Sequence, residues 1–227
     1  MTDIWMQTGT GRAFDLMAPA ADMVDLEHDV AEALAREPRF GGHVRSGPYS
    51  VAQHCVLGAD AIIAETGSIE TARAFLLHDA KEAYIKDQMT PLKQAFAAHV
   101  GLVFEMEHGA CSIGLPAAAR QTGKLIFWRA LAEMEFKVDA AIHAAAGHTW
   151  PLPPDIAARV RHWDLAMLAA ERRDLLCKPP KPWHASVERV PPPARLGRIT
   201  VWPWPKAADE WRARLHQLFP HLAANAA

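Results

Sequence analysis

The side chains that could do chemistry in this sequence are polar residues on otherwise apolar helix faces. His54, Asp79 and Asp164 each fall in register with apolar neighbours, and a buried carboxylate is costly unless it is paired or binds a metal. His78 directly precedes Asp79, and neighbouring helix positions lie about 100° apart, so both side chains can reach one ion beside the helix. Two imidazoles and two carboxylates would suit Mn²⁺, Fe²⁺, Co²⁺, Ni²⁺ or Zn²⁺, and Mg²⁺ less well. Water on the open coordination positions would be the reactive species in a hydrolysis.

The spacing alone leaves other interpretations open. A single histidine on an apolar face is more often a core residue than a metal ligand. His28-Asp29 is a second His-Asp pair, and we reject it as a ligand pair because it lies among three other acidic residues on what we expect to be a solvated face. Asp139 is a rival to Asp164, because it also follows apolar neighbours in a predicted helix.

The elements that must position these residues are predicted to be helices. Apolar residues recur with a helical period along most of the chain, which indicates an all-α fold. Ser50 and Gln53 form an S-x-x-Q capping box that marks the start of one helix, after a Gly-rich loop at 39–49. The predicted helices are 22–36, one that begins at Ser50, 69–86, 92–111, 116–146, one that begins at 154 or 155, and 207–218.

The segments without helical periodicity lie mainly at the two ends. Residues 1–20 are predicted to form an extended arm. Residues 178–206 are rich in Pro and Trp, and we expect an irregular segment that wraps the core, with a short strand at 198–202. The prediction is therefore a single domain over 1–227, with a core at about 22–176, an N-terminal arm at 1–20 and a C-terminal extension at 178–227.

Composition limits the classes of partner. The formal net charge of −2 gives no general basic field for a nucleic-acid polymer, although a small anionic substrate stays possible. The three cysteines, Cys55, Cys111 and Cys177, form no C-x-x-C pair, so we expect neither a thiolate zinc site nor disulfides. This cysteine usage is typical of a reducing compartment, so we expect a cytoplasmic location. We expect no signal peptide and no membrane span. The sequence leaves open whether the chain forms a homo-oligomer.

Three segments resemble a known family: YSVAQHC, FLLHDAKEAYIKDQMTPLK and VRHWDLAMLAAERRDL. They resemble the HD-domain phosphohydrolase superfamily, whose pattern is H…HD…D on an all-helical bundle. Within it the sequence is similar to the 5′-deoxynucleotidase branch, which continues with HD-x-x-E and D-x-x-T-P-x-K. The resemblance covers about residues 22–176, and it implies one divalent transition metal held by His54, His78, Asp79 and Asp164.

The resemblance also implies roles for residues around the metal. Glu82 lies one turn after His78 and Asp79, and the family has an acid there that orients or deprotonates the attacking water; the alternative is an ion pair with Lys86. Asp87 aligns with a residue beside the sugar 3′-hydroxyl, and the alternative is a carboxylate that caps the next helix.

Several cations could meet the phosphate. Arg39 precedes His54 by the interval of a phosphate-binding Arg in the deoxynucleotidase branch, and the alternative is a surface ion pair with Glu37 or Asp29. Lys93 is a candidate for a second phosphate-binding cation. His43 and Arg45, in the same loop as Arg39, are two further residues that could bind an anion.

One acid further along the chain has two open interpretations. Glu171 lies two turns after Asp164 on the same stripe. It either hydrogen-bonds a ligand histidine or pairs with a buried Arg, and the sequence does not separate these.

The function implied by the resemblance is release of phosphate from 2′-deoxynucleoside 5′-monophosphates. Two alternatives stay open: a deoxynucleoside triphosphate triphosphohydrolase on the same scaffold, and a catalytically silent HD module that binds a nucleotide. The retained Glu82 argues against the silent module.

Overall fold

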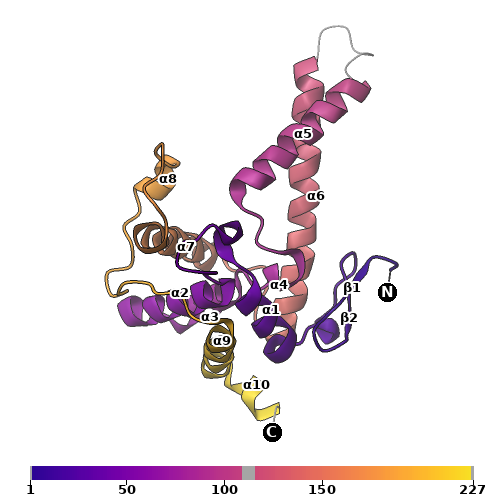
Figure 1. Ribbon diagram of the computed structural model, residues 1–227. Coiled ribbons are helices and arrows are strands. Elements are labelled where there is room, and N and C mark those ends of the chain that lie inside the picture. The colour runs from indigo at the N-terminus through magenta and orange to yellow at the C-terminus, as the bar shows by residue number, and fades with distance from the viewer. Residues whose placement is uncertain (1, 109–115, 226–227) are drawn as a thin grey trace.

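Helices account for most of the regular structure, which confirms the all-α prediction. The computed structural model describes residues 2–108 and 116–225, and Figure 1 shows a helical body from which a two-helix hairpin projects. The helical elements are η1 (Ala21–Met23), η2 (Leu26–Val30), α1 (Ala31–Arg36), η3 (Arg39–Gly42), α2 (Val51–Thr66), α3 (Ile69–Leu77), α4 (Glu82–Ile85), α5 (Thr90–His108), α6 (Pro116–Ala145), α7 (Pro154–Leu175), α8 (Ala185–Glu188), α9 (Trp204–Leu218) and α10 (Pro220–Asn225).

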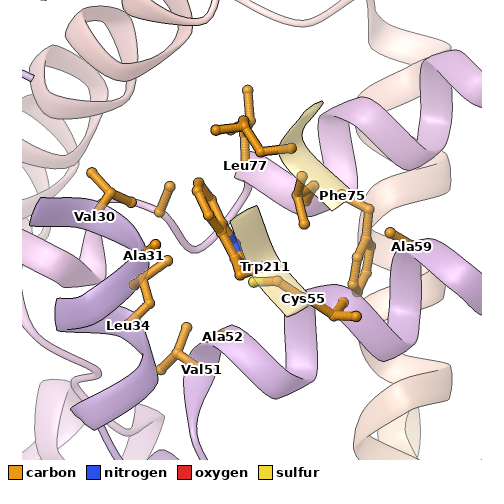
Figure 2. Packing of buried hydrophobic residues seen from close by; sticks show 14 of the residues in the cluster. Val30, Ala31, Leu34, Val51, Ala52, Cys55, Ala59, Phe75, Leu77 and Trp211 are labelled. Carbon is orange, nitrogen blue, oxygen red and sulfur yellow. The ribbon is translucent and has the colours of Figure 1, made fainter. Parts of the chain in front are cut away.

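Helix α2 is the central element of the body. Its predicted start is confirmed, because the Ser50 hydroxyl accepts a hydrogen bond from the Gln53 backbone N–H at 3.2 Å. Gly58 lets α3 approach closely, since a Cβ atom at this position would lie 2.1 Å from the Phe75 ring. Trp211 of α9 is fully buried, and Figure 2 shows it near Cys55 of α2. Part of the predicted C-terminal extension thus belongs to the hydrophobic core.

The predicted strand at 198–202 is wrong. The Gln53 side chain does not complete the capping box; its amide donates to the Thr200 carbonyl at 2.7 Å and accepts from the Trp202 N–H at 2.9 Å. A side chain on α2 therefore makes the pair of hydrogen bonds that a neighbouring strand would have made, and the segment stays irregular.

The N-terminal segment contains more structure than predicted. β1 (Trp5–Gln7) and β2 (Ala13–Asp15) pair antiparallel, with Met6 opposite Phe14. Their turn places Thr10 so that its N–H and hydroxyl donate to Asp29 at 2.8 and 2.7 Å. Asp29 is therefore buried, and its predicted place on a solvated face is wrong, whereas His28 is exposed.

Two predicted helices are interrupted. The first, 22–36, becomes η1, η2 and α1, because the Asp25 carboxylate accepts from the N–H groups of Glu27 and His28 and caps a new start. The second, 69–86, breaks after Leu77 into a turn and the short α4. The helix predicted at 92–111 is α5, and Cys111 lies outside the described residues. None of the helices in the described parts is long and apolar enough to cross a lipid bilayer.

Candidate metal centre

Two histidines face each other from α2 and from the end of α3: His54 is fully buried, and His78 is partly buried. The His54 Nδ1–H donates to Glu171 Oε1 at 2.6 Å, and the His78 Nδ1–H donates to the Phe75 carbonyl at 2.6 Å. A carbonyl can only accept, so Nδ1 of His78 carries the proton and Nε2 keeps its lone pair in the neutral ring. Neither Nε2 atom has a hydrogen-bond partner among the described residues, although both are buried. Such a pair of imidazole nitrogens is available to a cation.

Two carboxylates complete the cluster. Asp79 lies in the turn after α3, with Oδ2 3.2 Å from His78 Nε2 and 3.7 Å from His54 Nε2. His54, His78 and Asp79 each bring a donor atom within 4.8 Å of the others, so together they can hold a metal ion. Asp164 of α7 places Oδ1 3.5 Å from His54 Nε2 and 3.9 Å from His78 Nε2.

The rival aspartate lies elsewhere. Asp139 of α6 pairs with Lys81 at 3.5 Å, and burial raises the pKa of its carboxyl to about 6 even though Lys81 opposes the shift. Asp139 makes no hydrogen bond or ion pair with either histidine in the described structure. The geometry therefore joins Asp164 to the two histidines and leaves Asp139 in a separate ion pair.

Arg39 joins the carboxylates of the cluster. Its guanidinium lies 3.1 Å from Asp79 Oδ2, 3.3 Å from Glu171 Oε2 and 3.9 Å from Asp164 Oδ1, with only 11% of the side chain exposed. The alternative of a surface ion pair is wrong, because Glu37 pairs instead with Lys86. Its Nε atom is buried and makes no hydrogen bond to any residue described, so one donor of the fork is left for another acceptor.

The sequence left open whether Glu171 hydrogen-bonds a histidine of the cluster or pairs with a buried arginine, and in the structure it does both. One carboxylate oxygen accepts from His54 and the other from Arg39, and the side chain is fully buried. Burial opposes ionisation, yet Arg39 and His54 hold the pKa of Glu171 below its usual value.

Glu82 borders the cluster at the start of α4. Its Oε2 is buried and unpartnered within the described structure, and the alternative ion pair with Lys86 does not form. Burial raises the pKa of Glu82 well above its usual value, and the carboxylates of Asp79 and Asp87 add to the shift. A raised pKa makes the ionised carboxylate a stronger proton acceptor.

The remaining predicted substrate residues are less closely tied to the cluster. Asp87 is half-buried, and its N–H donates to Glu37; α5 begins three residues later, so Asp87 is not its capping residue. Lys93 pairs with Glu135 of α6 at 3.3 Å. His43 is exposed, and Arg45 is exposed and points at the Cys177 sulfur. Within the described residues, neither Lys93 nor His43 makes a hydrogen bond or ion pair with the two histidines.

Two residues were missed by sequence reasoning. Tyr49 is fully buried, and burial together with the nearby Glu171 carboxylate raises its pKa well above the usual value. Lys81 anchors Asp139 from the turn that carries the His-Asp pair. The position of Tyr49 directly before the Ser50 cap is a sequence signal that could have drawn attention to this residue. No signal in the sequence pointed to Lys81.

Comparisons with known proteins give relatives but no activity. No protein-family model matches the chain. The chain is 36% identical over 148 residues to the uncharacterized protein YfdR of Escherichia coli, and this aligned region covers 65% of the chain and 60% of YfdR. It is 37% identical over 98 residues to an uncharacterized protein of Rhodobacter capsulatus, and that aligned region covers 42% of the chain and 50% of the relative. The aligned regions thus span between half and 60% of these relatives' lengths.

Proposed function

We propose that this chain is a metal-dependent phosphohydrolase of the HD-domain superfamily that releases phosphate from 2′-deoxynucleoside 5′-monophosphates. The observation that supports it most is the pair of buried, unpartnered Nε2 atoms of His54 and His78 beside the carboxylates of Asp79 and Asp164. Imidazole nitrogen and carboxylate oxygen together favour a divalent transition metal over Mg²⁺.

A divalent ion held by these four residues would supply Lewis-acid polarisation of the phosphoryl group and would acidify water. The protein's own groups supply the rest. Glu82 lies at the border of the cluster and accepts the proton of the attacking water at its carboxylate. Arg39, already held by Asp79 and Glu171, offers its free Nε–H to a phosphate oxygen and offsets the charge of the phosphate. The P–O bond to the nucleoside breaks as the water oxygen bonds to phosphorus, and the departing nucleoside oxygen takes up a proton, so that the products are the nucleoside and inorganic phosphate.

The substrate is proposed to be a nucleotide because of residues next to the phosphate position. Asp87 follows Glu82 by five residues. Burial raises the pKa of the Asp87 carboxyl and Arg39 opposes the shift, so Asp87 and Arg39 are close enough to interact electrostatically. A carboxylate at this place can accept a hydrogen bond from a sugar hydroxyl.

The test is a screen of nucleoside mono-, di- and triphosphates with Mn²⁺, Co²⁺ and Mg²⁺, with products separated by chromatography. We expect inorganic phosphate and a deoxynucleoside from monophosphates. Glu82→Gln should keep its metal and lower kcat by about 10²–10⁴-fold, as expected for a lost general base. Glu133→Gln, an exposed acid on α6, is the matched control and should leave kcat unchanged.

Two results would overturn this proposal. Release of triphosphate would assign the chain to the triphosphohydrolase alternative. A metal-loaded protein that binds nucleotides and hydrolyses none of them would show a binding module.

A further inference from the structure

A cleft on the outer side of α7 lies apart from the metal centre. Its volume is about 670 Å³, within the range of about 300–1,000 Å³ that small-molecule sites occupy. Residues 176–190, which include α8, form its second wall, and α8 packs against α7 (Figure 1). Glu171 of the metal centre is fully buried and bonds to His54 of α2, whereas Arg173, which lines the cleft, lies about 200° further round the helix. The two sites therefore occupy different sides of α7.

One carboxylate holds the second wall against α7. Glu188 of α8 accepts from the Arg172 guanidinium at 3.0 Å and from the Trp183 N–H at 3.0 Å. The same guanidinium lies 4.8 Å from the centroid of the Trp183 ring, a distance at which a cation and an aromatic face attract each other. The indole is thus positioned at the cleft by its own chain, and a preformed wall lowers the entropy cost of binding a ligand.

Most of the charged side chains at the cleft are cations. Among the described residues that line it, three are basic and one is acidic: Arg172, Arg173, Lys178 and Glu188. Two of the cations are compensated, because Glu188 pairs with Arg172, and Asp174 pairs with Arg173 at 2.7 Å.

The uncompensated cations lie at the end of the cleft where Cys177 is found. Lys178 forms no ion pair with any residue that the structure describes. Arg45 reaches the same end, and its guanidinium lies 3.8 Å from the Cys177 sulfur. In a chain whose formal net charge is −2, this end of the cleft is locally positive and favours an anionic group.

We propose that the cleft binds a small planar anion, with its ring against Trp183 and its anionic group at Lys178 and Arg45. Leu176, Val187 and two prolines supply apolar lining, which suits a ring better than a free, fully hydrated anion. Aromatic carboxylates and nucleoside phosphates share this chemistry. No residue of the metal centre lines the cleft, so this proposal is independent of the proposed function, and a binding measurement at the cleft can fail or succeed whatever the chain hydrolyses.

The test is the rate at which N-ethylmaleimide alkylates Cys177 in the intact chain, followed by mass spectrometry of the peptide that contains it. Cys177 is exposed and lines the cleft, whereas Cys55 is buried, so a ligand in the cleft should slow the reaction at Cys177. At a ligand concentration of ten times Kd, the cleft is empty in about one chain of eleven, so the rate should fall by about tenfold.

Two probes carry both a ring and a negative charge. They are 1-naphthoate and the phosphonate analogue of AMP, in which a methylene group replaces the oxygen between ribose and phosphorus, so that hydrolysis cannot remove it. Adenosine lacks the charge, and inorganic phosphate lacks the ring. We expect protection by a ring-bearing anion and none by adenosine or phosphate at the same concentration. The probe that protects at the lower concentration distinguishes a nucleoside phosphate from an aromatic carboxylate.

Variants locate the binding site. Lys178→Glu should weaken binding by about 10–100-fold, as expected for a lost charge-assisted hydrogen bond, and Trp183→Leu by about 2–10-fold for a lost aromatic contact. Lys137→Glu, at an exposed lysine of α6, is the matched control and should leave protection unchanged. Each variant is compared with itself with and without probe, because Lys178→Glu also alters the reactivity of the neighbouring thiol. Circular dichroism checks that the helices are kept.

Three results would overturn the proposal. The first is the absence of protection by both ring-bearing probes. The second is equal protection by inorganic phosphate, which would identify a simple anion site without a place for a ring. The third is protection that survives both Lys178→Glu and Trp183→Leu, or that is lost in Arg39→Ala, because the probe would then bind elsewhere.

Discussion

Replacing Glu171 by glutamine should weaken metal binding without removing a proposed ligand. Glu171 accepts from the His54 Nδ1–H at 2.6 Å with one oxygen and from Arg39 at 3.3 Å with the other, and it is fully buried. The glutamine amide has the same shape but only one acceptor oxygen. Whichever way it turns, its NH₂ group faces either the ring N–H of His54 or the guanidinium of Arg39, and both of these are donors.

The size of the effect follows from what Glu171 does for His54. Its carboxylate holds the proton on Nδ1 and fixes the ring orientation, so that Nε2 is the nitrogen left for the metal. Loss of such a partner typically lowers metal affinity by about 10–100-fold, or about 1.4–2.7 kcal/mol. Glu171→Asp keeps the charge but is one methylene shorter, so it can serve His54 or Arg39 and not both. We expect Glu171→Asp to fall between wild type and Glu171→Gln.

The assay is competition for Mn²⁺ or Co²⁺ against a chromogenic chelator, with urea unfolding run beside it. Glu105→Gln is the control, because this acid also pairs with an arginine but lies on the hairpin. The unfolding curves show whether each variant is folded before its affinity is compared. If folded Glu171→Gln binds the metal as tightly as wild type does, Glu171 is a structural partner of Arg39 and does not act on the metal centre.

Two further predictions compare matched pairs of variants, and a third compares one variant with the wild type. Asp164→Ala should lose the metal in elemental analysis, and Asp139→Ala, which breaks only the pair with Lys81, should keep it; the reverse result would mean that the last ligand is misplaced. Arg39→Ala should mainly raise KM for the hydrolysed nucleotide, whereas Arg45→Ala should not; equal KM values would remove Arg39 from phosphate binding. Burial, with a contribution from His148, lowers the pKa of His143 from 6.5 to about 3, so the unfolded chain takes up a proton first and stability falls as pH drops below 6.5. Between pH 7.5 and pH 5.5 this lowers the free energy of unfolding of the wild type by about 1.4 kcal/mol. Urea unfolding of His143→Gln should therefore show a decrease that is smaller by about 1.4 kcal/mol over the same pH interval. An identical decrease in both proteins would exclude His143 as its source.

Local signals in the sequence were sufficient for the long helices. Ser50 caps α2 as predicted, and Pro154 starts α7, where a proline costs no backbone hydrogen bond. The stripe of α7 also placed Asp164 and Glu171 on one face, which the structure turns towards α2. These features depend on the nearest few residues, so a single sequence contains them.

The break after Leu77 was not predictable in this way. The residues of the turn have no helix-breaking side chain, so local preference continues the helix. In the structure the Phe75 carbonyl, which an uninterrupted helix would offer to the Asp79 N–H, accepts from the ring of His78 at 2.6 Å. The backbone then turns and carries Asp79 to the histidines. This exchange of a helix bond for a side-chain bond depends on the packing of the whole cluster.

Long-range ion pairs were the other gap. Arg39 bonds to Asp79 and Glu171, which lie 40 and 132 residues away, and no periodicity relates residues across such distances. The loop that carries Arg39 turns sharply through positive φ at Phe40 and Gly41, and this turn brings the guanidinium inward. The resemblance predicts a phosphate-binding role for Arg39, whereas its pairing with Glu171 and Asp79 is seen only in the three-dimensional structure.

The charges of the centre are the last argument for a divalent ion. Asp79, Asp164 and Glu171 bring three carboxylates together, and among the described residues Arg39 is the permanent cation that pairs with all three. Burial opposes a charge on His78, yet the carboxylates of Asp79 and Asp164 raise the pKa of its ring well above the usual value, so a proton can offset part of this charge. With both rings neutral, as metal binding requires, the cluster keeps two uncompensated negative charges in a largely buried setting, which is costly for a protein. One divalent cation offsets this charge, and the bare Nε2 atoms of His54 and His78 are suitable donors for it. Arg39 then remains as the positive group at the edge of the centre, where an anionic substrate would meet it.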